Sequence, residues 1–151
     1  MPQTVLILED SATQAAIIGK LFERVGYHPT CVSDHAGAVA QLKVQRWDLL
    51  AFDVFLGDSN TLEQLDLYRK LAPMTPIAIM TAGRRDNPMA ISQALNKARR
   101  NEVDFLLPKP FNFDDIQQIC KAVAARQHAR PLGGGAQVSE TPPAGDDTFY
   151  L

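Results

Sequence analysis

The chain has 151 residues, of which 46% are hydrophobic, enough to fill the core of one domain with an appendage. The formal net charge of −2 excludes a broad electrostatic attraction to nucleic acid, so we expect no DNA partner. The sequence shows no apolar leader and no apolar run near the length that crosses a bilayer. We therefore expect a soluble cytoplasmic protein without membrane insertion.

The first part of the chain predicts a strand, a helix and an edge strand. Residues 4–8 form a continuous apolar run, and Ser11 can then cap a helix that Gly26 ends. Residues 27–32 have the composition of a second strand. Because Pro29 cannot donate a hydrogen bond to a neighbouring strand, this second strand is expected at the edge of the sheet.

The middle of the chain predicts a buried strand between two helices. The helices are expected at residues 33–45 and 61–71, where apolar residues recur at helical spacing. Between them, residues 49–53 are apolar except for the acid Asp53, which is typical of an inner strand buried on both faces. Asp53 is therefore expected where a buried strand leaves the core.

The last part predicts two more strands, at residues 76–80 and 103–107, each followed by a helix. The first of these helices is expected from Asn87 to about Arg100, because an asparagine cap followed by proline is a strong helix start. The second is expected from Asn112 to about Gln127.

Five repeats of strand then helix predict one α/β domain at residues 1–126, and the chain beyond it, 127–151, is expected to be a disordered tail rich in proline and glycine. Right-handed crossovers place helices on both faces of a parallel sheet. We expect a flavodoxin-like, doubly wound, five-stranded parallel sheet in the order 2-1-3-4-5 with five helices. In such sheets, ligands bind outside the carboxyl ends of the strands.

Polar side chains follow four of the predicted strands: Glu9 and Asp10, Asp53, Thr81 and Lys109. Because the carboxyl ends of parallel strands share one edge of the sheet, we expect these side chains in one crevice. Three carboxylates there repel one another by about 4 kcal/mol per close pair at an effective dielectric constant near 20. The crevice therefore needs positive charge.

A divalent cation and Lys109 can supply that charge. Mg²⁺ prefers oxygen ligands and shares its coordination between carboxylates, water and phosphate. Thr81 adds a hydroxyl donor, so the set suits phosphoryl transfer. Asp53 is the natural acceptor, because a carboxylate can form an acyl phosphate.

This set of residues resembles the response-regulator receiver domain, the CheY-like family, over nearly all of the predicted domain. The matching motifs are the acidic pair Glu9-Asp10, the acceptor Asp53, the pair Thr81-Ala82 and the run Lys109-Pro110-Phe111. The resemblance implies a phosphorelay protein of a two-component system, whose Asp53 is phosphorylated by a histidine kinase or phosphotransfer protein. It also implies Mg²⁺ held by Glu9, Asp10, Asp53 and the backbone carbonyl of Phe55, and a cis Lys109–Pro110 bond.

A stand-alone signalling protein fits the sequence better than an enzyme. A phosphatase that used Asp53 as nucleophile would need a general acid two residues later, where the chain has Phe55. We expect no second domain after Arg126, so the protein would act by presenting a surface. The face made by the last two predicted helices and the strand between them is expected to bind a downstream protein.

Two alternative functions remain open. Arginines lie at both ends of the helix predicted at 87–100, in an unusually long segment: Arg84, Arg85, Arg99 and Arg100. Cations suit the negative end of a helix, but guanidinium groups also bind phosphate and guanine and stack on bases. One alternative is therefore a CheY-like effector that binds cyclic di-GMP, and the other is a receiver-like scaffold that never takes phosphate.

The chain departs from the family at an aromatic position. Receiver domains usually keep an aromatic residue three positions before the lysine, where this chain has Leu106, preceded by Phe105. Either a bulge near Pro108 absorbs an extra residue or the aromatic switch is absent. We favour a core position for Phe105.

Overall fold

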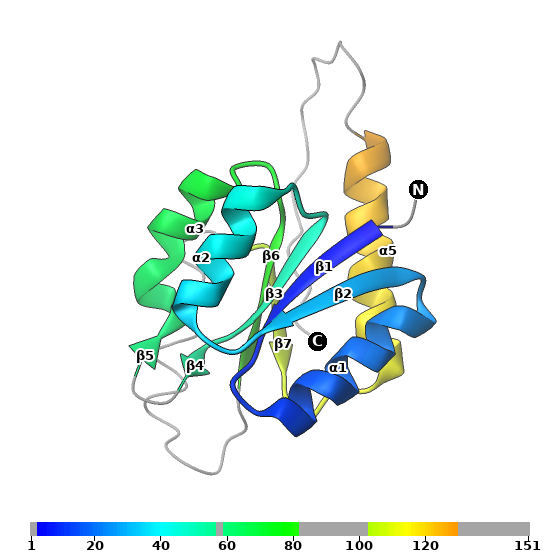
Figure 1. The fold of residues 1–151 in the computed structure, drawn as a ribbon. Coiled ribbons are helices and arrows are strands. Elements are labelled where there is room, and N and C mark those ends of the chain that lie inside the picture. The colour runs from blue at the N-terminus through cyan, green and yellow to red at the C-terminus, as the bar shows by residue number, and fades with distance from the viewer. Residues whose placement is uncertain (1–2, 57–58, 82–102, 130–151) are drawn as a thin grey trace.

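The structure, a computed structural model, describes residues 3–56, 59–81 and 103–129. Its parallel sheet has five strands, β1 (Gln3–Leu8), β2 (Tyr27–Val32), β3 (Leu49–Asp53), β6 (Ile77–Thr81) and β7 (Phe105–Pro108), in the order β2-β1-β3-β6-β7 (Figure 1). This arrangement confirms the predicted order 2-1-3-4-5 and the edge position of β2. The helix predicted at 87–100 and its four arginines lie outside the described residues.

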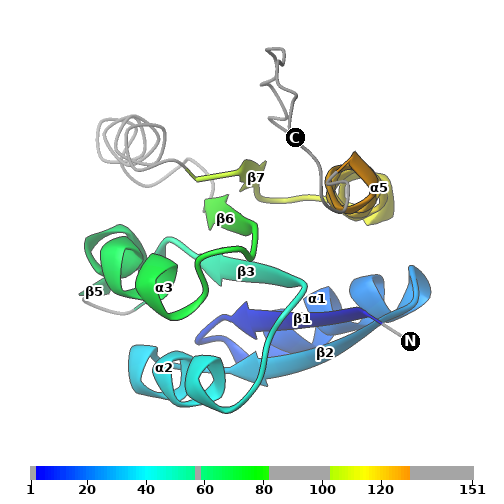
Figure 2. The ribbon, with the colours of Figure 1, turned by 90° about the horizontal axis from the view of Figure 1, so that it is seen from above.

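Helices cover both faces of the sheet, as in a flavodoxin-like fold. The described α-helices are α1 (Ala12–Arg24), α2 (His35–Val44), α3 (Leu65–Leu71) and α5 (Phe113–Ala129). Figures 1 and 2 show α1 and α5 on one face and α2 and α3 on the other. Since α5 continues to Ala129, it extends past the predicted domain boundary at residue 126, and that boundary stays a prediction.

Two hydrophobic clusters, one on each face, hold the helices to the sheet. In β3, Leu50 and Phe52 belong to the cluster under α2 and α3, whereas Leu49 and Ala51 belong to the cluster under α1 and α5. This alternation follows from the two-residue period of an extended chain. Because both faces are covered, the inner strands are continuously apolar, and their polar residues are confined to the strand ends.

Local hydrogen bonds fix the starts of the helices. The Ser11 hydroxyl accepts from a backbone N–H of the first turn of α1, and Gly26, with a φ of +99°, follows the end of that helix. At α5, the Asn112 side chain accepts from the Asp115 N–H, while the Asp115 carboxylate accepts from the Asn112 N–H. This reciprocal pair caps the helix that was predicted to begin at Asn112.

A small hairpin after β3 was not predicted. It consists of β4 (Phe55–Leu56) and β5 (Ser59–Asn60), and the next residues form a 3₁₀ helix, η1 (Thr61–Gln64), before α3 begins. The buried Thr61 hydroxyl donates to the backbone carbonyl of Asp53, which ties the hairpin to the end of β3. The single helix predicted at 61–71 is therefore wrong in its first turn, which is tighter than an α-helix.

Strand β7 begins later than the strand predicted at 103–107. Asp104 lies just before it, and its carboxylate accepts from the backbone N–H of Ile77 at 2.8 Å. The Asp104 carboxylate therefore satisfies the Ile77 N–H, which a backbone carbonyl would satisfy in a regular strand pair. Regular strand geometry starts at Phe105.

The β6–β7 pairing is continuous through Pro108 and contains no bulge. Phe105 is buried in the cluster under α1 and α5, which confirms the predicted core position, and Leu106 packs in the cluster on the opposite face. Phe105 therefore points to the wrong face to replace an aromatic residue at position 106.

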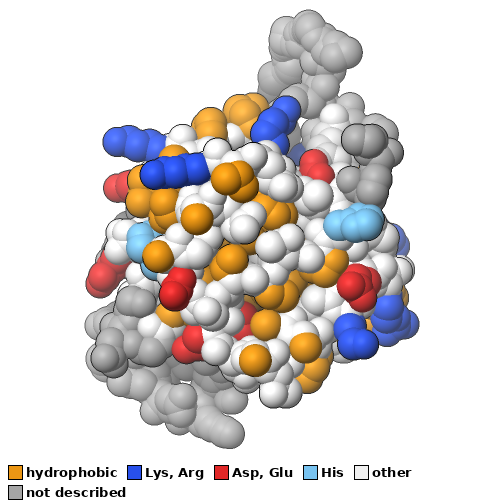
Figure 3. Space-filling view, viewed as in Figure 1, with side chains coloured by type: hydrophobic (Ala, Val, Ile, Leu, Met, Phe, Trp, Pro, Cys, Tyr) orange, Lys and Arg blue, Asp and Glu red, His pale blue; other side chains and the backbone are white. Residues whose placement is uncertain are grey.

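No helix in the described part of the chain is long and apolar enough to cross a membrane. On the face shown in Figure 3, lysine and arginine side chains lie at separate positions among acidic, polar and apolar ones. The described residues of this face form no extended basic patch.

Candidate functional site

The carboxyl edge of the sheet brings together residues that are distant in sequence. The parallel register of β1 and β3 places Glu9 level with Asp53. Asp53 pairs with Met80, one residue before Thr81. The backbone N–H of Lys109 donates to the carbonyl of Thr81 at 2.8 Å, which fixes the chain after β7 at the same edge.

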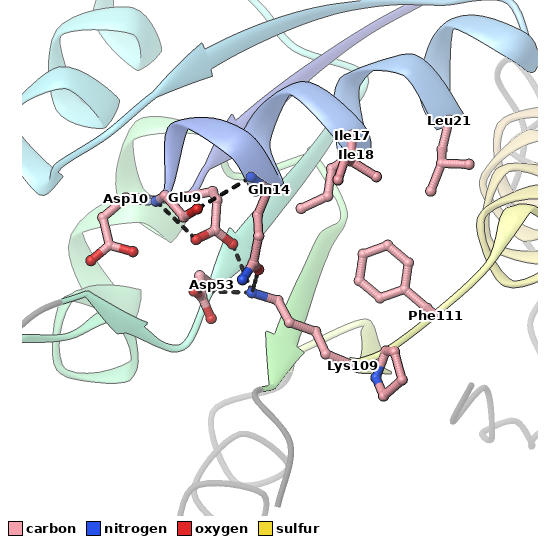
Figure 4. Close-up of a pocket in the computed structure, with 11 residues that line it drawn as sticks. Glu9, Asp10, Gln14, Ile17, Ile18, Leu21, Asp53, Lys109 and Phe111 are labelled. Carbon is pink, nitrogen blue, oxygen red and sulfur yellow. Dashed lines mark hydrogen bonds and ion pairs between the residues drawn. The ribbon is translucent and has the colours of Figure 1, made fainter.

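The Lys109 ammonium lies between carboxylates from two other strands (Figure 4). Its Nζ atom is 2.7 Å from Glu9 Oε1 and 3.3 Å from Asp53 Oδ2. It also donates to Gln14 Oε1 at 2.9 Å. The ammonium therefore offsets part of the negative charge that converges at this edge.

Burial makes the electrostatics of this site strong. Glu9 and Asp53 are only 3% and 5% exposed, whereas Asp10 is exposed. Desolvation raises the pKa of Asp53 to about 7, against the lowering effect of the Lys109 charge and with a further rise from Glu9. The cost of removing the ionised Asp53 carboxylate from water is therefore larger than the stabilisation it receives from the Lys109 ammonium.

The acidic residues can hold a divalent cation. Glu9, Asp10 and Asp53 each offer one carboxylate oxygen, and these oxygens lie within 4.8 Å of one another. Asp53 Oδ1 is buried and has no hydrogen-bond partner among the described residues. An orphaned carboxylate oxygen beside two further carboxylates fits a hard cation such as Mg²⁺, which prefers oxygen ligands.

Two other predicted site residues, Thr81 and Phe55, also lie at this edge. Among the described residues, the hydrogen-bond partners of the Lys109 ammonium are Glu9, Gln14 and Asp53. Thr81 is buried at the end of β6, and its side chain is not among the described residues that line the hollow beside Asp53. Phe55 is half-buried in β4, where it packs against the cluster under α2 and α3. The roles of the Thr81 hydroxyl and the Phe55 carbonyl remain predictions.

The hollow beside Asp53 has a volume of about 490 Å³ and two chemically different sides. Its acidic side carries Glu9, Asp10 and Asp53, and its apolar side includes residues of α1 and of the segment after β7, among them Ile17, Leu21 and Phe111 (Figure 4). Lys109 also lines the hollow and supplies positive charge that an anionic group entering beside the three carboxylates would need.

Gln14 is the site residue that the sequence analysis missed. It lies on the first turn of α1, lines the hollow and accepts from Lys109. The available signal was its position one helical turn after the acidic pair. That spacing places a side chain near the pair but does not tell which way it points.

Comparisons with known proteins agree with this geometry. Residues 5–121 match the family model described as the response regulator receiver domain. The chain is 26% identical over 137 residues to the probable transcriptional regulatory protein TcrX of Mycobacterium tuberculosis, covering 91% of this chain and 56% of that protein. Other curated relatives are longer, and the chain spans as little as 25% of their length.

Solved structures show the same fold. The CheY-like response regulator receiver domain protein of Methanospirillum hungatei superposes with a TM-score of 0.73 at 19% identity, covering 85% of this chain and 98% of that one. A response regulator of Burkholderia pseudomallei, solved with a phosphorylated aspartic acid, a calcium ion and citrate, gives a TM-score of 0.67 at 20% identity. The match covers 83% of this chain and 72% of that protein's chain.

Proposed function

Because the chain belongs to the response regulator receiver domain family, we propose that it is a cytoplasmic phosphorelay protein whose Asp53 accepts a phosphoryl group from a histidine kinase or phosphotransfer protein. Receiver domains are signalling domains of two-component systems rather than enzymes. The observation that carries this proposal is the position of the Lys109 ammonium, 3.3 Å from Asp53 Oδ2 and 2.7 Å from Glu9.

The proposed reaction transfers the phosphoryl group between a nitrogen and an oxygen. A carboxylate oxygen of Asp53 bonds to phosphorus while the bond from phosphorus to the donor imidazole nitrogen breaks, and the electron pair of that bond stays on the imidazole. Lys109 stabilises the negative charge on the phosphoryl oxygens, and the Thr81 hydroxyl follows the phosphoryl group once it is bound.

Mg²⁺ fits the same set of residues. Glu9, Asp10, Asp53 and the backbone carbonyl of Phe55 would hold it, and when bound it supplies positive charge toward the phosphoryl oxygens. The phosphorylated aspartic acid and calcium ion of the Burkholderia pseudomallei relative support this assignment. The protein's own residues orient the acceptor, since Thr61 donates to the Asp53 carbonyl.

The signal leaves through a surface rather than through a reaction. Phosphorylation changes the population of conformations in the face that includes β7 and α5, and a downstream protein binds that face. The predicted helix at 87–100, which was expected to share this face, lies outside the described residues.

Incubation with acetyl phosphate and Mg²⁺, followed by the intact mass, tests the proposal. The parent protein should gain the mass of one phosphoryl group, and the Asp53→Ala variant or added EDTA should abolish the gain. A parent that gains no mass, while a known receiver does so in the same buffer, would contradict the proposal and favour the scaffold alternative.

A further inference from the structure

The three hydrogens of the Lys109 ammonium have three acceptors. Two are the carboxylates of Glu9 and Asp53, at 2.7 and 3.3 Å, and the third is the neutral side-chain oxygen of Gln14, at 2.9 Å. An ammonium has three donors and no acceptor, so this set is complete. Any phosphoryl oxygen that binds Lys109 must replace one of these partners.

Chemistry fixes the orientation of the Gln14 amide. Because an ammonium can only donate, the amide atom facing Nζ must be the oxygen. The Gln14 backbone N–H donates to the Ser11 hydroxyl at 3.2 Å, so the cap of α1 anchors the residue, and its side chain reaches toward Lys109 (Figure 4). A substitution that changes only the side chain leaves that backbone anchor in place.

The neutral partner is the one whose replacement costs least. Separating the ammonium from Glu9 or Asp53 breaks an ion pair in a site where both acids are buried. Separating it from Gln14 breaks only a hydrogen bond at an exposed residue. The hydrogen that Gln14 holds is therefore the one available to a phosphoryl oxygen.

We propose that Gln14 is a positioning residue for phosphoryl transfer, which keeps one Lys109 hydrogen directed into the hollow and releases it to the phosphoryl group. This inference rests on the proposed function. Without the Gln14 oxygen, the ammonium settles onto the two carboxylates and must reorganise when phosphate arrives. A preorganised donor avoids that reorganisation.

Gln14→Met tests the inference, because methionine keeps the length of the side chain and removes the acceptor. Phosphorylation by acetyl phosphate should slow by about three- to tenfold, the range expected for one net hydrogen bond. Thr13→Ala is the matched control, because Thr13 is exposed on the same turn and does not line the hollow. It should phosphorylate at the parent rate.

Nuclear magnetic resonance provides the second readout, through the ¹H–¹⁵N signal of the Lys109 ammonium without added metal. Glu9 and Asp53 still accept from Lys109 in Gln14→Met, so the signal should persist there, but with a changed chemical shift and faster hydrogen exchange with water, because one of three acceptors is lost. Gln14→Glu, which retains an acceptor oxygen, should keep the slow exchange of the parent. The inference is overturned if Gln14→Met phosphorylates at the control rate, or if its rate falls while the chemical shift and exchange rate of the Lys109 ammonium match those of the parent. A parent that takes no phosphate would instead refute the proposed function.

Discussion

Asp53 combines a buried position with a charge that the proposed phosphoryl transfer requires. The strand that carries it is apolar up to this residue, so the carboxyl group is desolvated by the same packing that fixes its position. Desolvation raises the pKa of Asp53 to about 7, although Lys109 works in the opposite direction. The metal-free protein therefore loses stability when Asp53 ionises.

The sign of this effect predicts a pH-dependent difference between the parent and Asp53→Asn. Between the unfolded pKa near 4 and the folded pKa of about 7, the folded state holds the proton more tightly, so stability falls as pH rises through this window. In EDTA at pH 8, Asp53→Asn should be more stable by on the order of 4 kcal/mol, because the pKa rises by about three units at about 1.4 kcal/mol each.

The same comparison at pH 5 is the control, because there the folded parent holds its proton. The difference in midpoint of thermal unfolding, followed by circular dichroism, should shrink at that pH. An equal difference at both pH values would contradict the assignment of the cost to the Asp53 charge.

At the residue scale, position in the chain predicted which acids meet, but not how the lysine is held. Glu9, Asp53 and Lys109 follow predicted strands, so the topology alone brings them to one edge of the sheet. The contact from Gln14 depends on the side-chain conformation of Lys109, which no sequence pattern encodes.

At the scale of elements, Asp104 joins parts of the fold at the edge opposite the acidic site of Glu9, Asp10 and Asp53. Its carboxylate accepts from Arg69 of α3 at 3.1 Å, from Arg126 of α5 at 2.6 Å, and from the backbone N–H of Ile77 in β6 at 2.8 Å. The Arg126 guanidinium also lies 5.0 Å from the centre of the Phe105 ring. One side chain therefore links two strands with a helix on each face.

Asp104→Ala should destabilise the protein by about 1–3 kcal/mol, because it leaves the Ile77 N–H without its acceptor. Asp104→Asn retains an acceptor oxygen and should cost less. Urea unfolding measures both changes. Because Arg126 is half exposed, the difference between Asn and the parent should shrink at high salt, whereas the difference between Ala and Asn should not. Equal stabilities of Ala and Asn would contradict this account.

Among the described residues, strands and helices of ordinary length could be predicted, and the shorter elements could not. Each strand of β4 and β5 has two residues, too few to show an alternating pattern. The later start of β7 depends on the Asp104 side chain, which a pattern of apolar residues cannot reveal.

At the scale of the molecule, the parallel sheet separates the core from the site. Apolar residues fill both faces, and the residues with reactive groups lie where the strands end. The strand order could be predicted because alternating strands and helices allow few arrangements.

The three carboxylates come together only in the folded protein, because they lie at the ends of different strands. A cation bound there should therefore stabilise the whole domain. At about 100 times its dissociation constant, Mg²⁺ should raise the free energy of unfolding by about 2.7 kcal/mol, and EDTA should reverse the rise. Asp10→Asn should lose most of this gain without unfolding, because Asp10 is exposed. Asp66→Asn, which changes the charge equally at an exposed position of α3, should keep it. An unchanged gain in Asp10→Asn would exclude this cation site.

The identity of the residue that receives the phosphoryl group tests the central claim most directly. Borohydride reduces an aspartyl phosphate to homoserine, so treating the acetyl phosphate reaction with borohydride and sequencing the peptides by mass spectrometry identifies the acceptor. We predict homoserine at position 53 alone, with Glu9 and Asp10 unchanged. Homoserine at another aspartate, or phosphate on a protein that yields none, would contradict the account.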